Sequence, residues 1–275
     1  MTALNAALTS AADAILLPLA GLPAAAVVVG AALATALVVL GVMRYTSNQA
    51  ALAAVKRRIH ASLLEMRLFN DDVRALVRAQ GEVLAQNALY IGHSLVPLVV
   101  TAIPLAFAIA QLQAYYGYAG LRPNVETTIT VELTSALPAG ALPRLIAPTL
   151  DPAGPPRYFP SLRQVVWRVE PRAPGLHEIA IEVDGTTPVT KSLYVSADDA
   201  AARRSPFRDT GGLVSQLLYP SEPPLDRGGP VAAVRLDYPE RTLRVAGIDM
   251  HWLILYVAVS FVFVLLLRKP LGVVI

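Results

Sequence analysis

Three long apolar stretches divide the chain, and each of them predicts a membrane-spanning helix. They cover residues 24–43, 94–116 and 252–267, and none of them contains a charged residue. A helix needs about 20 such residues to cross the hydrocarbon core of a bilayer. Pro23 stands directly before the first stretch, where proline is tolerated at a helix start. We therefore predict three transmembrane helices with these bounds.

Aromatic residues gather near the outer ends of the second and third stretches. Their amphipathic rings are typical of a lipid–water interface. They are Tyr115, Tyr116, Tyr118, Trp252 and Tyr256.

Lys and Arg are unevenly distributed around these stretches. The segment 44–93 holds seven of them against four acidic residues, and Arg268 and Lys269 follow the third stretch. Since cytoplasmic loops carry the excess of positive charge, we expect both regions to be cytoplasmic. The predicted division is an extracytoplasmic N-terminal segment 1–23, a cytoplasmic segment 44–93, an extracytoplasmic segment 117–251 and a cytoplasmic tail 268–275.

Within the segment 44–93, apolar residues recur with the period of a helix. The stripe consists of Leu52, Val55, Ile59, Met66, Phe69, Val73, Leu76 and Val83, with Ser62 and Gln80 as polar members. Both ends of the segment return to the same membrane face, and Asn70-Asp71-Asp72 near its middle offers an N-cap for a helix over 73–90. These features predict a cytoplasmic antiparallel helical hairpin.

The alternative is a basic amphipathic helix that lies flat in the lipid headgroups. In that arrangement Lys56, Arg57 and Arg58 contact anionic lipid or a partner. A solvated basic face that serves only as a topology signal explains the same three residues.

The segment 117–251 predicts a β-rich domain. Residues 125–133 alternate between apolar or small side chains and Glu or Thr, which is the pattern of a half-buried strand. Further strands are predicted over 164–169, 178–183, 190–195, 231–238 and 242–245, with one short helix at 213–219. Strands at this spacing are typical of an immunoglobulin-like β-sandwich, here with Trp167 buried in its core. The predicted fold class is thus an α+β membrane protein.

Composition narrows the class of function. Of all residues 55 % are hydrophobic and 16 % are charged, and the 23 Lys and Arg exceed the 20 Asp and Glu by three. The basic residues are scattered, so we expect no nucleic-acid partner. The chain has no cysteine, and its four histidines are dispersed, so no metal or other cofactor is expected. The lack of cysteine fits a bacterial envelope protein, and we predict the inner membrane.

No catalytic motif is present. The sequence contains no Gly-rich phosphate loop, no Gly-x-Ser-x-Gly and no His-Glu-x-x-His. We therefore expect a protein that is not an enzyme and that has no catalytic residues.

Three hydroxyl side chains stand at a similar depth in the predicted spans. Thr35, Thr101 and Ser260 each lie about 10–12 Å from the cytoplasmic end of their helix. In a bundle of the three helices they would form a polar groove, with Arg44 and His93 at its rim. The alternative is that these hydroxyls bond to their own helix or to a neighbouring one.

The arrangement of these segments resembles the three-helix core of the YidC-type insertase superfamily. Ser94-Leu95-Val96-Pro97, Ile103-Pro104-Leu105 and Ala110-Gln111-Leu112 are similar in character to the proline-containing second core span of that family. The resemblance covers roughly 24–116 and 252–275. The chain departs from the family in two respects. The arginine nearest to the predicted groove, Arg44, stands at the end of its span and not inside it. The segment 117–251 is inserted between the second and third spans.

The resemblance implies a non-enzymatic insertion factor. A shallow polar groove would ease the passage of a hydrophilic segment through the bilayer. The expected partners are lipids, other membrane proteins or nascent chains, and a periplasmic protein. The competing hypothesis is an accessory subunit of a larger inner-membrane complex whose periplasmic domain binds a partner. A receptor whose outer domain binds a ligand is a third hypothesis.

Overall fold

The computed structural model describes residues 2–46, 49–68, 72–138, 141–183, 185–196, 202–245 and 247–273. The chain forms two compact units. The first, here called the β unit, contains residues 1–28 and 109–255, and the second, the helical unit, contains residues 29–108 and 256–275. The chain is an α+β protein with antiparallel sheets, as the sequence predicts.

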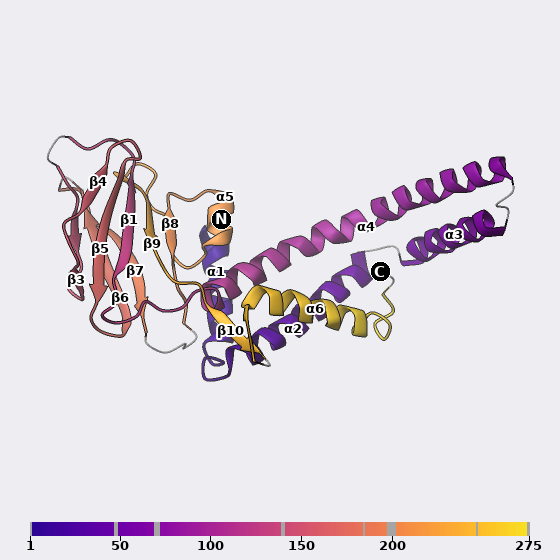
Figure 1. The fold of residues 1–275 in the computed structure, drawn as a ribbon, viewed down its shortest axis with the longest axis horizontal. Coiled ribbons are helices and arrows are strands. Elements are labelled where there is room, and N and C mark those ends of the chain that lie inside the picture. The colour runs from indigo at the N-terminus through magenta and orange to yellow at the C-terminus, as the bar shows by residue number, and fades with distance from the viewer. Residues whose placement is uncertain are drawn as a thin grey trace. The chain divides into compact units, whose positions relative to one another are not determined.

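Six helices are present in the described part of the chain (Figure 1). They are α1 (Thr2–Leu16), α2 (Ala24–Thr46), α3 (Gln49–Leu68), α4 (Val73–Tyr116), α5 (Leu213–Leu218) and α6 (Trp252–Leu267). Within the described ranges, α2 and α4 are long and apolar enough to cross a membrane. The third predicted span, α6, has 16 residues, a length of about 24 Å against about 30 Å of hydrocarbon.

The start of α4 is fixed by Asp72. Its carboxylate oxygen Oδ1 accepts the backbone N–H groups of Arg74 at 2.8 Å and Ala75 at 3.2 Å. These are two of the donors that a helix start leaves without an intrahelical acceptor. The N-cap predicted from the sequence is therefore confirmed for Asp72, while Asn70 and Asp71 lie outside the described residues. The helix then continues without a break to Tyr116, so the expected helix 73–90 and the expected span 94–116 are one element.

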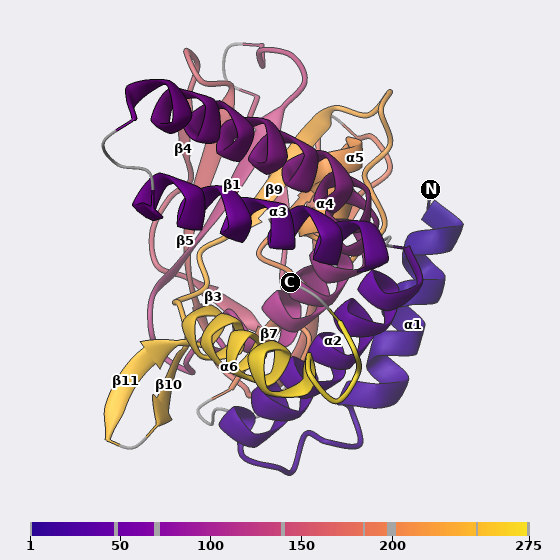
Figure 2. The same ribbon diagram turned by 90° about the vertical axis from the view of Figure 1, so that its right-hand side faces the viewer.

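Helix α3 and the first half of α4 lie side by side and run in opposite directions (Figures 1 and 2). The Nζ of Lys56 on α3 lies 5.6 Å from the centre of the Tyr90 ring on α4. The predicted hairpin therefore matches this arrangement better than one flat helix does.

The predicted stripe is the more buried side of α3, from Leu52 through Ser62. On α4 the prediction is wrong for two members, because Val73 and Gln80 are exposed and Ala79 is buried instead. Phe69 lies outside the described residues.

The strands of the β unit form three sheets among the described residues. Six strands form one sheet in the order β3-β5-β1-β9-β8, with β4 also paired to β5. Three strands form a second in the order β2-β6-β7, and β10 pairs with β11. Their bounds are β1 Thr127–Leu133, β2 Arg144–Ile146, β3 Leu150–Pro152, β4 Arg157–Phe159, β5 Gln164–Pro171, β6 Gly175–Glu182, β7 Val189–Val195, β8 Phe207–Asp209, β9 Val231–Leu236, β10 Thr242–Val245 and β11 Ile248–His251.

One hydrophobic core joins the two larger sheets. Alternate residues of β1 contribute Ile129, Val131 and Leu133, and the facing sheet contributes residues such as Ile179 and Leu193. The register places Ile129 opposite Trp167 of β5, which is buried as the sequence predicts. The period-two pattern of these strands therefore buries one face of each sheet.

The chain reaches and leaves these sheets through two neighbouring connections, 117–126 and 237–241. Tyr118 pairs with Glu240 in an antiparallel bridge. The N–H of Ala119 donates to the carbonyl of Pro239 at 2.9 Å, and that of Arg241 donates to the carbonyl of Gly117 at 3.1 Å. A Cβ at position 117 would lie 2.7 Å from the carbonyl oxygen of Gln113, so only glycine fits where α4 ends.

The N-terminal segment and the aromatic residues differ from expectation. Residues 2–16, expected only as part of an extracytoplasmic segment, form the regular helix α1. Tyr115, Tyr116 and Trp252, expected at a lipid–water interface, are completely buried. The indole N–H of Trp252 donates to Gln113 Oε1 at 2.8 Å. The Tyr115 hydroxyl likewise donates to a protein group, the Asp13 carboxylate, whereas the buried Tyr116 hydroxyl has no hydrogen-bond partner within the described residues.

Candidate functional site

A cavity of about 200 Å³ lies between α2 and α4 in the helical unit. Its walls are formed by Ala34, Thr35, Val38, Val39, Thr101, Pro104, Leu105 and Ala108. Two of the three hydroxyl residues singled out in the sequence, Thr35 and Thr101, therefore line the same space. The remaining walls are apolar, so the cavity is less polar than the groove that the sequence predicts.

Both threonine hydroxyls have hydrogen-bond partners. Thr101 Oγ1 donates to its own helix, with the carbonyls of Pro97 at 2.8 Å and Leu98 at 3.0 Å within reach. Thr35 Oγ1 accepts the hydroxyl of Tyr256 on α6 at 2.8 Å. Thr101 thus bonds to its own helix and Thr35 to a neighbouring one, the two possibilities left open by the sequence.

Pro104 affects the backbone hydrogen bonds of α4 beside Thr101. Pro104 has no N–H, so the carbonyl of Val100 has no donor four residues ahead of it on α4. The wall of the cavity therefore includes Pro104, a residue that removes one donor from the backbone ladder of α4.

The third hydroxyl residue, Ser260, does not line this cavity. Its Oγ is buried and has no hydrogen-bond partner within the described ranges. Instead, α6 places Tyr256 against α2, one turn before Ser260. Tyr256 and Ser260 are four residues apart and so share one face of α6, which is the signal in the sequence that points to Tyr256.

The two residues expected at the rim lie elsewhere. The Nη1 of Arg44 donates to the carbonyl of Leu271 at 3.2 Å, so the end of α2 contacts the chain that follows α6. His93 is exposed on α4. Neither belongs to the cavity walls.

Of the three basic residues singled out on α3, Lys56 packs over the Tyr90 ring within the helical unit. Arg57 and Arg58 are exposed. These two remain accessible to lipid or to a partner.

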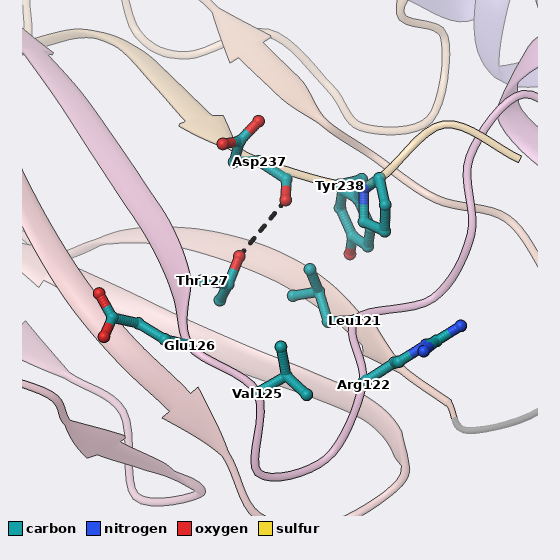
Figure 3. A pocket seen from close by; sticks show the side chains of 8 residues that line it. Leu121, Arg122, Val125, Glu126, Thr127, Asp237 and Tyr238 are labelled. Atoms are coloured by element: carbon teal, nitrogen blue, oxygen red, sulfur yellow. Dashed lines mark hydrogen bonds between the residues drawn. The ribbon is translucent and has the colours of Figure 1, made fainter.

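The β unit has a surface hollow of about 410 Å³ between its two connections (Figure 3). Arg122, Glu126 and Asp237 supply charged groups of both signs, while Leu121, Val125, Thr127, Tyr238 and Pro239 complete the lining. The Thr127 hydroxyl donates to the carbonyl of Asp237 at 3.3 Å. The Tyr238 hydroxyl accepts the Tyr194 N–H at 2.7 Å, and burial raises the pKa of Tyr238. Charges of both signs beside apolar side chains suit a peptide segment better than a small anion or cation.

A buried ion pair joins β7 to the segment that precedes β9. Lys191 is fully buried, and its ammonium group contacts the Glu222 carboxylate and donates to Ser205 Oγ at 2.7 Å. Ser192 donates to Glu222 Oε1 through its N–H and its hydroxyl, both at 2.8 Å. Each charge is therefore well supplied with hydrogen bonds.

The pKa values of this pair follow from its burial. Burial lowers the pKa of Lys191 to about 8, although the Glu222 carboxylate acts in the opposite direction. For Glu222, burial alone would raise the pKa, but the Lys191 charge and the surrounding hydrogen bonds hold it below its ordinary value. Ser205 is also buried, at 4 % exposure, so we assign a structural role to the close Lys191–Ser205 contact.

A second polar cluster ties α1 to the C-terminal end of α4. Arg203 contacts Asp13 and donates to Gln111 Oε1 at 2.9 Å. Arg204 donates to the carbonyl of Tyr115 at 2.9 Å, which satisfies an acceptor in the last turn of α4. Cations at this position also interact favourably with the helix dipole.

Within the described residues, no group of three or more His, Asp or Glu side chains could hold a metal ion. Comparison with family models, curated proteins and solved structures found no match for this chain.

Proposed function

We propose that the chain is a bacterial inner-membrane protein that assists the insertion of other membrane proteins, as its resemblance to the YidC-type superfamily implies. The observation that carries this proposal is the cavity between α2 and α4, which Thr35 and Thr101 both line. A polar group that enters the hydrocarbon loses its hydrogen bonds to water, at a cost of several kcal/mol. Threonine hydroxyls in an apolar groove offset part of that cost without covalent chemistry.

The proposed topology has three spans, namely α2, the second half of α4, and α6. The α3–α4 hairpin and the C-terminal tail are cytoplasmic, and the sheets of 117–251 form a periplasmic immunoglobulin-like β-sandwich. Two contacts support the direction of α6: Tyr256 meets Thr35, and Leu271 meets Arg44 further along α2. Helices α2 and α6 are thus parallel, as two spans that both run toward the cytoplasm must be. A span as short as α6 is accommodated by local thinning of the bilayer, which would also shorten the path of a client.

The test uses the purified full-length protein in liposomes. The client is a single-span model protein with a short polar N-terminal tail, and insertion is read as protection of that tail from added protease. Thr101→Leu fills the cavity, and Thr101→Val keeps its shape but removes the hydroxyl. Val99→Leu, on an exposed part of α4 outside the cavity, is the matched control.

We expect Thr101→Leu to lower the protected yield several-fold, Thr101→Val to have a smaller effect, and the control to match the unaltered protein. Equal yields from Thr101→Leu and the unaltered protein would contradict the role of the cavity. Yields no higher than those of protein-free liposomes would contradict the insertion function itself.

The surface hollow in the β unit favours a second candidate function, an accessory subunit whose periplasmic domain binds a partner. Purification of the tagged protein in mild detergent distinguishes the two functions. An accessory subunit retains a few partners at fixed ratio and loses them when Arg122 is changed to Glu. An insertion factor retains many membrane proteins at low ratio, whatever residue stands at position 122.

A further inference from the structure

A second apolar face runs along α4, distinct from the face that packs against α3. The less exposed face contains Ala79, which is buried, and Leu76 and Val83, which are half-buried. The second face is formed by Val77, Gly81, Leu84, Ala88, Ile91, Leu95 and Leu98, all of them exposed. We call these seven residues the α4 seam. Their spacing alternates between four and three positions, which is the period of a coiled coil.

The α4 seam is open along its length. Leu84 is 72 % exposed and Ile91 is 64 % exposed. A Cβ added at Gly81 would meet no atom within 4 Å. Lipid would cover Leu95 and Leu98, but the part before Ser94 belongs to the segment proposed to be cytoplasmic. A contiguous apolar strip in water marks an interaction site.

We propose that the α4 seam binds the same seam of a second copy of this chain, as a parallel, in-register coiled coil. Two copies in one membrane have the same orientation, so their α4 helices run in the same direction. This step rests on the membrane placement proposed above. Each layer of the seam then meets its own equivalent, Leu84 against Leu84 and Ile91 against Ile91.

The charges beside the seam favour a second copy over a different helix. Heterologous coiled coils select their partners through charged residues that flank the apolar layers. Among the flanking positions of the α4 seam only Arg78, at its start, is charged. The others are uncharged: they are Gln80, Ala85, Asn87, Gly92 and Ser94. The amides of Gln80 and Asn87 can both donate and accept hydrogen bonds, so they also suit pairing between like chains.

The size of the α4 seam is sufficient for a specific dimer. Its five large side chains are each at least half exposed. Each side chain would bury on the order of 100 Å² of surface, so the two copies together would bury about 1,000 Å². This area is the lower limit for a specific interface. The small residues Gly81 and Ala88 between them allow the helices to approach closely.

Because the chain has no natural cysteine, disulfide formation tests the pairing directly. Ala88→Cys places a single thiol at the centre of the seam, and Leu89→Cys places one on the neighbouring exposed position, about 100° around the helix. The full-length variants are oxidised mildly in native membranes. We expect Ala88→Cys to yield a disulfide-linked species of twice the chain mass, at least tenfold more than Leu89→Cys. Equal yields from both variants, or linkage of Ala88→Cys only to a protein of another size, would overturn the proposal.

Substitutions of opposite charge at Leu84 supply a second measurement, whose expected rescue a folding defect would not produce. Since Leu84 is exposed, Leu84→Glu and Leu84→Lys should leave the single chain intact. In the Ala88→Cys background each change alone should lower the linked dimer at least tenfold, and co-expression of the two should restore it. Leu89→Glu is the matched control and should have no effect. Failure of the mixed pair to recover would contradict in-register pairing. The yield of linked dimer is read without any measurement of client insertion, so a failed insertion assay would leave this result standing.

Discussion

Arg203 holds Asp13 through two nitrogens on one carboxylate oxygen, with Nε at 2.9 Å and Nη2 at 2.5 Å from Oδ1. The Tyr115 hydroxyl donates to the same oxygen at 2.5 Å. Three segments that are distant in sequence, namely α1, the end of α4 and the stretch before β8, therefore meet at one carboxylate. This contact makes α1 an integral part of the β unit.

Asp13→Asn should release α1 from this contact. The change removes the negative charge and leaves the Arg203 side chain, 15 % exposed, without its ionic partner. A hydrogen bond to a charged group contributes roughly 1.5–3 kcal/mol, and we expect a loss within that range. Limited proteolysis measures it, because cleavage within residues 2–22 should become faster. Ser10→Ala, at an exposed position of the same helix, should leave the cleavage rate unchanged, and equal rates for Asp13→Asn and Ser10→Ala would refute the role of Asp13.

Lys191→Met should destabilise the β unit strongly. It leaves the Glu222 carboxylate buried without its cation, and breaking a buried pair in this way costs about 3–5 kcal/mol. The double variant Lys191→Met with Glu222→Gln should recover part of this loss, because the amide keeps bonds to Ser192 and Ser205 without a charge. Thermal unfolding monitored by circular dichroism gives both values.

An exposed ion pair in the same unit serves as the control for this measurement. Arg168 and Glu126 are 50 % and 45 % exposed, so Arg168→Met should cost less than about 1 kcal/mol. If the single variant at Lys191 were no less stable than the double variant, the buried pair would not be the source of the effect.

The same pair predicts sensitivity to acid. The pKa of Glu222 is lower in the folded chain than its ordinary value of 4.5. Its contribution to stability is therefore fully present above that value, and it is lost as the pH falls through the folded pKa. Between pH 6 and pH 3 the melting temperature of Glu222→Gln should fall less than that of the unaltered protein. Parallel curves for the two proteins would exclude this explanation.

Asp72→Ala should weaken the start of α4 by about 1 kcal/mol, because two backbone N–H groups lose their acceptor. Hydrogen exchange of the amides of Arg74 and Ala75 should become faster. Asp72→Asn, which keeps a side-chain oxygen, should exchange almost as slowly as the unaltered protein. Protection that stays the same in Asp72→Ala would show that α4 begins independently of this cap.

Local patterns were enough to predict several elements of the fold. Ile129, Val131 and Leu133 alternate with polar residues, and a half-buried strand requires nothing more. Likewise, a cap residue followed by a helical pattern predicted the start of α4 at Val73. Thr35 and Thr101, singled out with Ser260 for their similar depth in the apolar stretches, line one cavity, whereas Ser260 does not.

Other features depend on contacts that no local pattern reveals. Asp13 looks like the edge of an apolar run until Arg203, far along the chain, is placed beside it. Strand β8 has only three residues, too few for an alternating pattern, and it exists because it pairs with β9. The sequence pattern places Gln80 on the wrong face because it continues the heptad phase of α3 across the turn, whereas α4 is a separate helix that begins at Val73.

The paired connections at Ala119 and Pro239 also bear on how such a chain can be rearranged. Because the strands leave and rejoin the helices at neighbouring positions, excision of the intervening segment would leave two ends that a short turn could join. Most of the β unit is therefore encoded by one continuous segment that could be inserted or removed as a single piece. A gene encoding only the helices could gain, lose or exchange it while the chain connection between α4 and β10 stays short.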